Sequence, residues 1–149
     1  MARTKPPVPT PVSADEVELE LYTAMQRGDI ERLMAVWSDD DEITCVHPGG
    51  PRLVGAAAIR AAFEAMFAHG TIAAEPHRVR RLDSHSSAVH SVLERVRVKT
   101  ADGGEQFAWV VATNVYLKSA QGWRLVAHHA SPGSASEVQE IAETASILH

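Results

Sequence analysis

The stretch EQFAWVVATNVYLKSAQGWRLVAHHAS, residues 105–131, decides the fold, because apolar side chains recur on both faces of its two halves. A period of two predicts β-strands, here over residues 105–118 and 123–131, on either side of the turn SAQG. Two similar segments, 77–84 and 88–99, come before it, and the turn ADGGE connects the later one to residue 105 as a hairpin. The second half of the chain therefore predicts an antiparallel sheet of four long strands.

Both faces of the strand at 105–118 carry apolar side chains. One face carries Val110, Ala112, Asn114 and Tyr116, and the other carries Phe107, Trp109, Val111, Val115 and Leu117. Two such faces are too apolar for water, so both are expected to be covered. Helices can cover one face, and we expect a second copy of the chain to cover the other, which gives a homodimer through the outer face of the sheet. The open alternative is a monomer whose own C-terminal helix packs there.

Amphipathic helices are predicted upstream of the sheet. Ser13 followed by Glu16 is a capping box, and apolar residues at helical spacing continue from there to Gly28, with Glu18 off the apolar stripe. A second short helix follows, and a third is expected over residues 56–69. Helices first and antiparallel strands afterwards indicate an α+β domain, with the helices covering one face of a curved sheet.

The chain is expected to form one domain over residues 13–133. The proline-rich segment 1–12 is predicted to be a flexible tail, and residues 134–149 are predicted to form a C-terminal helix or tail. No internal repeat or domain boundary is visible in the sequence.

Composition excludes several classes of function. The chain has 149 residues and a formal charge of −5, which argues against nucleic acid as a partner because phosphate binding needs a basic face. Its apolar runs are too short to cross a bilayer, and its N-terminus lacks the apolar core of a secretory signal, so neither a membrane partner nor secretion is expected. The single cysteine, Cys45, fits a reducing compartment, and a cytoplasmic location is predicted.

His47 is the first candidate for chemistry. It ends the predicted strand ITCVH, residues 43–47, and is followed by the turn PGGPR. A histidine in a turn is commonly bonded to a nearby carbonyl, and that interpretation remains open. The functional interpretation is a neutral imidazole at the wall of a pocket, able to take or give a proton near neutral pH.

The neighbours His128 and His129 must point to opposite faces of their strand. Simple alternation places His129 on the mainly apolar face with Leu125, so His129 is the better candidate for a site, although a structural core histidine is equally compatible. Glu94 falls on an apolar stripe, where burial would raise its pKa and make it a candidate acid. A bulge that turns Glu94 outward, or a cross-strand pair with an arginine, is the alternative.

The sequence contains no cofactor signature. It lacks the H-x-x-x-H, H-E-x-x-H and C-x-x-C spacings of metal sites, the glycine-rich loop of nucleotide sites and the G-x-S-x-G motif of serine hydrolases. A scattered metal triad of His47, Glu94 and His129 is an alternative that spacing cannot test. We therefore expect no metal and no cofactor.

Two segments together resemble a known superfamily. ELYTAMQRGDIERLMAVWSDDDEITCVHPGGPRLVGAAAIRAAF, residues 20–63, and ATNVYLKSAQGWRLVAHHAS, residues 112–131, are similar to the first and last parts of nuclear transport factor 2-like (NTF2-like) proteins, especially the SnoaL-like and ketosteroid-isomerase-like bacterial proteins. The resemblance covers roughly residues 15–131. It implies a cone-shaped fold, in which a curved antiparallel sheet wraps around the N-terminal helices and leaves an internal apolar pocket, and it implies frequent dimers.

The resemblance also implies a site. Ketosteroid isomerases use a general base in the turn after the first strand, which matches His47, and an oxyanion-binding acid on the penultimate strand, which matches Asn114. Their helical tyrosine matches Leu21, whereas Tyr22 is one position away and is expected to point about 100° around the helix. An amide is a weaker donor than a carboxylic acid, and the loss of one good donor costs roughly 100- to 1000-fold in rate. Efficient steroid isomerisation is therefore not expected.

Three functions remain in competition. The first is an isomerase, cyclase or dehydratase that moves a proton through His47, with Asn114 and His129 as the other catalytic candidates, on a small apolar carbonyl or cyclic substrate. The second is a non-catalytic carrier of a small apolar ligand, and the third is an assembly or partner-binding domain that works through the outer sheet face. The residues expected to line the pocket are Trp37, Met34, Tyr22, Phe63, Glu94 and Tyr116.

Overall fold

A computed structural model describes residues 10–134 of the chain. The elements are α1 (Ala14–Arg27), α2 (Ile30–Ala35), β1 (Thr44–Val46), β2 (Arg52–Val54), α3 (Ala56–Phe67), β3 (Ala74–Asp83), β4 (Ser87–Lys99), β5 (Glu105–Ser119) and β6 (Gly122–Pro132). No helix in this part of the chain is long and apolar enough to cross a membrane. The predicted C-terminal helix and most of the predicted N-terminal tail lie outside the described residues.

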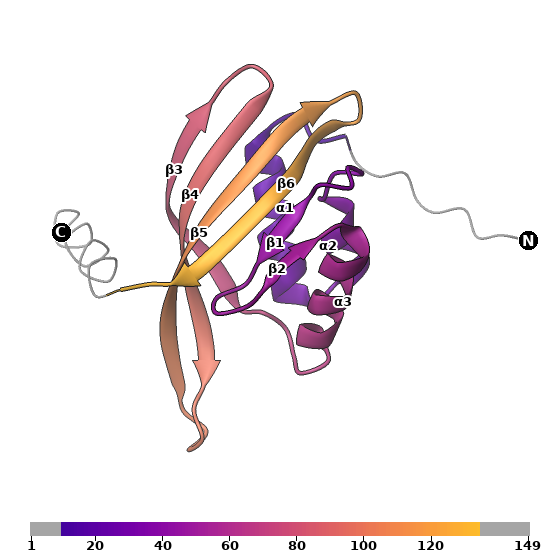
Figure 1. The fold of residues 1–149 in the computed structure, drawn as a ribbon. Coiled ribbons are helices and arrows are strands. Elements are labelled where there is room, and N and C mark those ends of the chain that lie inside the picture. The colour runs from indigo at the N-terminus through magenta and orange to yellow at the C-terminus, as the bar shows by residue number, and fades with distance from the viewer. Residues whose placement is uncertain (1–9, 135–149) are drawn as a thin grey trace, which may run out of the picture.

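The six strands form one curved sheet that does not close into a barrel, in the order β2-β1-β6-β5-β4-β3 (Figure 1). The predicted α+β class is confirmed, with the three helices gathered on one side of the sheet (Figure 1). All neighbouring strands are antiparallel except β1 and β6, which are parallel. This parallel pair brings the first short strand beside the last long one, although about 80 residues of chain separate them.

Helix α1 begins and ends where the sequence predicts. The Ser13 side chain accepts a hydrogen bond from the Glu16 backbone N–H, and Gly28 ends the helix in the left-handed conformation at φ 65°. The buried face is wider than the predicted apolar stripe, because Glu18 and Tyr22 are also buried. The expectation that Glu18 lies off the buried stripe is therefore wrong, and its carboxyl group needs partners inside the protein.

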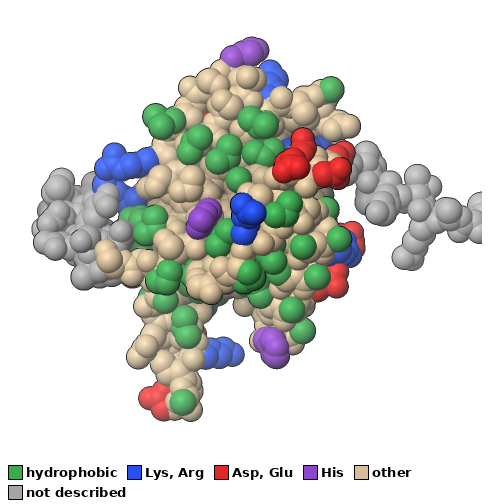
Figure 2. All heavy atoms as spheres, in the orientation of Figure 1, with side chains coloured by type: hydrophobic (Ala, Val, Ile, Leu, Met, Phe, Trp, Pro, Cys, Tyr) green, Lys and Arg blue, Asp and Glu red, His purple; other side chains and the backbone are tan. Residues whose placement is uncertain are grey.

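The two faces of β5 differ in burial. Ala112, Asn114 and Tyr116 are fully buried, and Asn114 and Tyr116 are hydrogen-bonded to side chains of α1. On the opposite face, Phe107 is 49% exposed and Leu117 is 45% exposed. Hydrophobic side chains are spread over the centre of the molecular face seen in Figure 2, and most acidic ones gather towards its edge. Within residues 10–134 no helix covers this outer face.

Candidate functional site

A row of polar side chains crosses the inner face of the sheet. Strand pairing places Asn114 on β5 opposite His90 on β4 and opposite His128 on β6, and places His128 opposite Cys45 on β1. Residues in register on neighbouring strands point to the same face, so these four side chains lie side by side, and α1 contacts the row at His90 and Asn114. His90, Asn114 and His128 are each no more than 5% exposed, and such deep polar groups require hydrogen bonds.

Those hydrogen bonds form a continuous chain. The Tyr22 hydroxyl donates to the Glu94 carboxyl oxygen Oε2 at 2.6 Å, and the Asn114 amide nitrogen Nδ2 donates to the Tyr22 oxygen at 3.2 Å. The Asn114 amide oxygen lies 2.5 Å from Nδ1 of His128. Because an amide oxygen only accepts, Nδ1 of His128 must carry the proton. The other ring nitrogen, Nε2, is then unprotonated and can accept a hydrogen bond.

Burial sets the protonation states of the side chains in this hydrogen-bonded series. It raises the pKa of Glu94 to about 7, although the Tyr22 hydrogen bond opposes the shift. Burial, the Glu94 charge and the hydrogen bond to Glu94 raise the pKa of Tyr22 well above its usual value. Burial, followed by the charges of His47 and His129, lowers the pKa of His128 to about 3. His128 is therefore a neutral imidazole at neutral pH, while Glu94 exchanges its proton close to neutral pH.

His47 follows β1 and lies half-buried at the edge of this row. Its ring meets the Phe63 ring edge-on, with 4.8 Å between centroids, and lies 6.3 Å from the His128 ring. The Cys45 sulfur is 3.7 Å from Nε2 of His47. Burial lowers the pKa of His47, so this imidazole is neutral at neutral pH and can act as a base. The parallel pairing of β1 with β6 is what brings His47 to His128, because Val46 is in register with His129.

The predicted orientation of the histidine pair on β6 is wrong. His128 is buried and His129 is exposed, the reverse of simple alternation from Leu125. The cause is a β-bulge: Tyr116 pairs with Leu125 but Val115 pairs with Ala127, so Val126 is an extra residue on β6. One extra residue inverts the faces of everything that follows it. His129 therefore lies on the opposite face of the sheet from Asn114 and does not join the site.

The predicted direction of Tyr22 is also wrong. Tyr22 is 2% exposed and its hydroxyl contacts both Glu94 and Asn114, whereas the helical spacing predicts that it points away from them. Leu21, at the family's tyrosine position, is also buried. The buried face of α1 is wide enough to include both positions, so the Tyr22 hydroxyl reaches the polar row.

A second set of buried hydrogen bonds, centred on Glu18, lies one turn of α1 away from Tyr22, and the sequence pattern did not predict it. Glu18 accepts a hydrogen bond from the Tyr116 hydroxyl at 2.6 Å and lies 2.8 Å from Nδ1 of His90. Glu18 is four residues before Tyr22, a spacing that puts both on one face of a helix. That spacing is the signal that could have found Glu18.

The other residues expected to line the pocket differ in how deeply they are buried. Phe63 and Trp37 are buried in the core, and Met34 packs against it half-buried. The Trp37 indole N–H has no hydrogen-bond partner within the described part of the chain. Glu94 is 6% exposed, so its side chain points into the protein and is not turned outward by a bulge.

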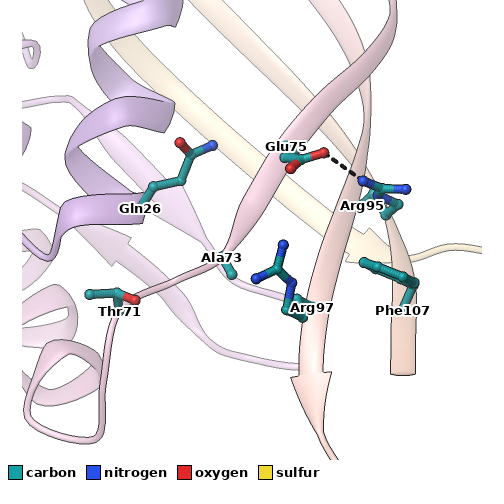
Figure 3. A pocket seen from close by; sticks show the side chains of 7 residues that line it. All are labelled: Gln26, Thr71, Ala73, Glu75, Arg95, Arg97 and Phe107. Carbon is teal, nitrogen blue, oxygen red and sulfur yellow. Dashed lines mark hydrogen bonds and ion pairs between the residues drawn. The ribbon is translucent and has the colours of Figure 1, made fainter. Parts of the chain in front are cut away.

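Two open hollows lie on the surface of the described residues, and neither is lined by His47 or Asn114. The larger, about 270 Å³, lies where the end of α1 meets β3, β4 and β5 (Figure 3). There Arg95 is paired with Glu75 at 2.8 Å and its guanidinium lies 4.4 Å from the centre of the Phe107 ring. The smaller hollow, about 200 Å³, lies at the start of α1 beside His90.

Comparison with known proteins identifies the family. Residues 15–135 match the profile of the SnoaL-like domain. The chain belongs to the SnoaL-like domain family. A comparison with curated proteins finds no match.

Solved structures with the same fold come from several organisms. One, provisionally named a calcium/calmodulin-dependent protein kinase type II association domain, from Thiobacillus denitrificans, is 31% identical, with 85% of this chain and 99% of that chain covered and a TM-score of 0.75. Another, provisionally named a dehydratase of the NTF2-like family, from Streptomyces avermitilis, is 28% identical, with 81% and 94% covered and a TM-score of 0.73. The CaMKII hub of S. rosetta is similar in fold, at 24% identity, with 83% and 100% covered and a TM-score of 0.64. These likenesses confirm the NTF2-like resemblance.

Proposed function

We propose that this SnoaL-like protein is an enzyme that moves a proton on a small, largely apolar carbonyl or cyclic substrate, as an isomerase, cyclase or dehydratase. The observation that carries the proposal is the buried chain from Glu94 through Tyr22 and Asn114 to His128, which ends 6.3 Å from the His47 ring. A polar chain buried this deeply costs stability unless every member is satisfied, so its presence at a half-exposed imidazole favours a functional role. The S. avermitilis relative, provisionally named a dehydratase, agrees with this class of reaction.

The roles follow from the hydrogen bonds. His47, neutral and half-buried, takes a proton from the carbon next to the substrate carbonyl and returns it to another carbon of the same substrate. His128 presents an unprotonated Nε2 that accepts a hydrogen bond from a hydroxyl group of the substrate and so orients it. Asn114 is a positioning residue, because its amide oxygen fixes the tautomer of His128 and its amide nitrogen is held by Tyr22. This replaces the expected role of Asn114 as the group that polarises the carbonyl.

Substrate class follows from the surroundings of His47. Phe63 packs against the imidazole, and Trp37 carries a buried N–H that a ligand oxygen would satisfy. The groups around His47 are aromatic rings, a thiol and neutral polar side chains, which favours an uncharged ligand over a phosphate. Residues Met34, Phe63 and Trp37 are proposed to line the pocket.

Deuterium exchange tests the proposal, because it detects proton removal from any ketone that reaches His47. A panel of small cyclic ketones and enones is incubated with the protein in D2O, and incorporation of deuterium next to the carbonyl is followed by NMR. We expect at least one compound to exchange faster with the wild-type protein, and the rate to fall to background in His47→Ala. His85→Ala, which removes an exposed histidine elsewhere, is the matched control and should exchange as the wild type does.

Two outcomes would count against the enzyme. Equal exchange by His47→Ala, with the fold confirmed by circular dichroism, would refute the role of His47. Release of an unchanged small molecule from the denatured protein, detected by mass spectrometry, together with no exchange of any compound, would favour the ligand carrier.

Assembly is a second candidate function, favoured by the exposed apolar outer face of β5. Phe107 and Leu117 are about half exposed there, and two relatives are named as an association domain and a hub. A homodimer through this face predicts a dimer mass in light scattering that Leu117→Asp reduces to a monomer. Leu19→Asp, at a position 69% exposed on α1, is the matched control and should leave the mass unchanged. A monomeric wild-type protein at high concentration would contradict it.

A further inference from the structure

The smaller hollow combines ligand atoms of the kind that bind metal ions. It is about 200 Å³, is formed between the start of α1 and the β3–β4 turn, and is lined by Asp15, Asp83 and His90 together with Ser13, Ser84 and Trp123 among others. Ligand atoms of Asp15, Glu18 and His90 all lie within 4.8 Å of one another. It is separate from the His47 site, since His90 stands at the other end of the polar row.

His90 is oriented as a metal ligand would be. Its side chain is only 1% exposed, and Nδ1 lies 2.8 Å from the Glu18 carboxyl oxygen. A carboxyl oxygen accepts, so Nδ1 carries a proton, and in the neutral tautomer with that proton Nε2 is the nitrogen whose lone pair can bind a metal ion. Nε2 lies 3.7 Å from Oδ1 of Asp83, on the side of the ring opposite to Glu18. A histidine whose far nitrogen donates to a carboxylate is the usual arrangement at metal centres.

Distances and charge also suit a cation. Two ligand atoms bound to one tetrahedral ion at about 2.1 Å are separated by about 3.4 Å, so Nε2 of His90 and Oδ1 of Asp83, 3.7 Å apart, need to close by only a few tenths of an ångström. Three carboxyl groups, those of Asp15, Glu18 and Asp83, surround a single guanidinium, Arg81. The hydrogen bond to Asp15, followed by the charges of Asp15, Glu18 and Asp83, raises the pKa of Arg81. The cluster therefore holds more acidic than basic groups.

We propose that this hollow binds one divalent transition-metal ion such as Zn2+, through Nε2 of His90 and the carboxylates of Asp83 and Asp15, with Glu18 orienting His90. A mixed nitrogen and oxygen donor set favours Zn2+ over Mg2+, which prefers oxygen ligands alone. Arg81, which now donates to Asp15 at 2.8 Å, competes with the ion for that carboxylate. Spacing along the sequence could not show this set, because its members come from α1, β3 and β4.

Calorimetric titration of the untagged full-length chain with ZnCl2 tests the proposal. We expect one ion per chain, and roughly tenfold weaker binding or worse in both Asp83→Asn and Asp15→Asn. Arg81→Ala should bind Zn2+ more tightly than the wild type, because it frees Asp15. The exposed Asp39→Asn is the matched control and should bind as the wild type does.

The nitrogen NMR signal of His90 is read in the wild-type protein, so the result does not depend on whether a His90 variant folds. Addition of Zn2+ should shift Nε2 of His90 and leave the exposed His85 unchanged. The proposal is overturned if Zn2+ does not bind, if the two aspartate variants bind normally, if Arg81→Ala binds no more tightly, or if His85 shifts in place of His90.

Discussion

Glu94→Gln should remove the component of stability that Glu94 supplies at pH 5 and loses by pH 8. A carboxyl group with a pKa of about 7 in the folded protein and 4.5 in the unfolded chain binds more protons when folded, so folding loses stability as pH rises through that window. The difference corresponds to about 3 kcal/mol, and Glu94 is only 6% exposed, so solvent screens little of it. The glutamine side chain imitates the protonated carboxyl and can still accept from Tyr22.

Urea denaturation followed by tryptophan fluorescence at pH 5, 6, 7 and 8 measures this effect. The wild-type free energy of unfolding should fall relative to that of Glu94→Gln by about 3 kcal/mol from pH 5 to pH 8. The exposed Glu42→Gln should follow the wild type across the same range. Parallel curves for the wild type and Glu94→Gln would refute the argument that burial governs Glu94.

Three further predictions concern the neighbouring side chains. His128→Ala should lower the free energy of unfolding in urea by about 1–3 kcal/mol, because it leaves the buried Asn114 amide without its partner. His129→Ala, at an exposed position, should change it by no more than about 0.5 kcal/mol. Equal effects of the two variants would contradict the bulge in β6. The pKa of His47, followed by NMR, should lie below 6.5 and move back towards it in Phe63→Ala, which opens the ring to water; a value above 6.5 would contradict its burial. Burial raises the pKa of Cys45 to about 12, so iodoacetamide at pH 8 should label it far more slowly in the folded protein than in urea, and equal rates would contradict this.

Local sequence patterns predict the helices and strands well, but they predict less reliably to which face of a helix or strand a side chain points. The capping box, the glycine at the end of α1 and the alternation of β5 correctly predict the α+β class and group Asn114 with Tyr116 on one face of the strand. The same alternation fails on β6, because the bulge at Val126 depends on how β5 and β6 pair. No local signal in the sequence marks it.

The polar interior could be predicted only in part. The stripe on β4 indicates that a carboxyl group, Glu94, is buried, but its partner Tyr22 is 72 residues away and local patterns say nothing about such a pair. The helical pattern leaves Glu18 off the apolar stripe because it is polar, yet it is buried because Tyr116 and His90 satisfy it. Buried polar residues are placed by long-range partners, which the fold alone reveals.

A crystal structure with a small planar phenol, an analogue of an enol intermediate, tests the central claim most directly. We predict that the phenol ring packs against Phe63 and that its oxygen lies within hydrogen-bond distance of His47 or of Nε2 of His128. Binding only in the hollow beside Arg95 and Phe107, or a closed interior at His47 with no ligand bound, would contradict the account.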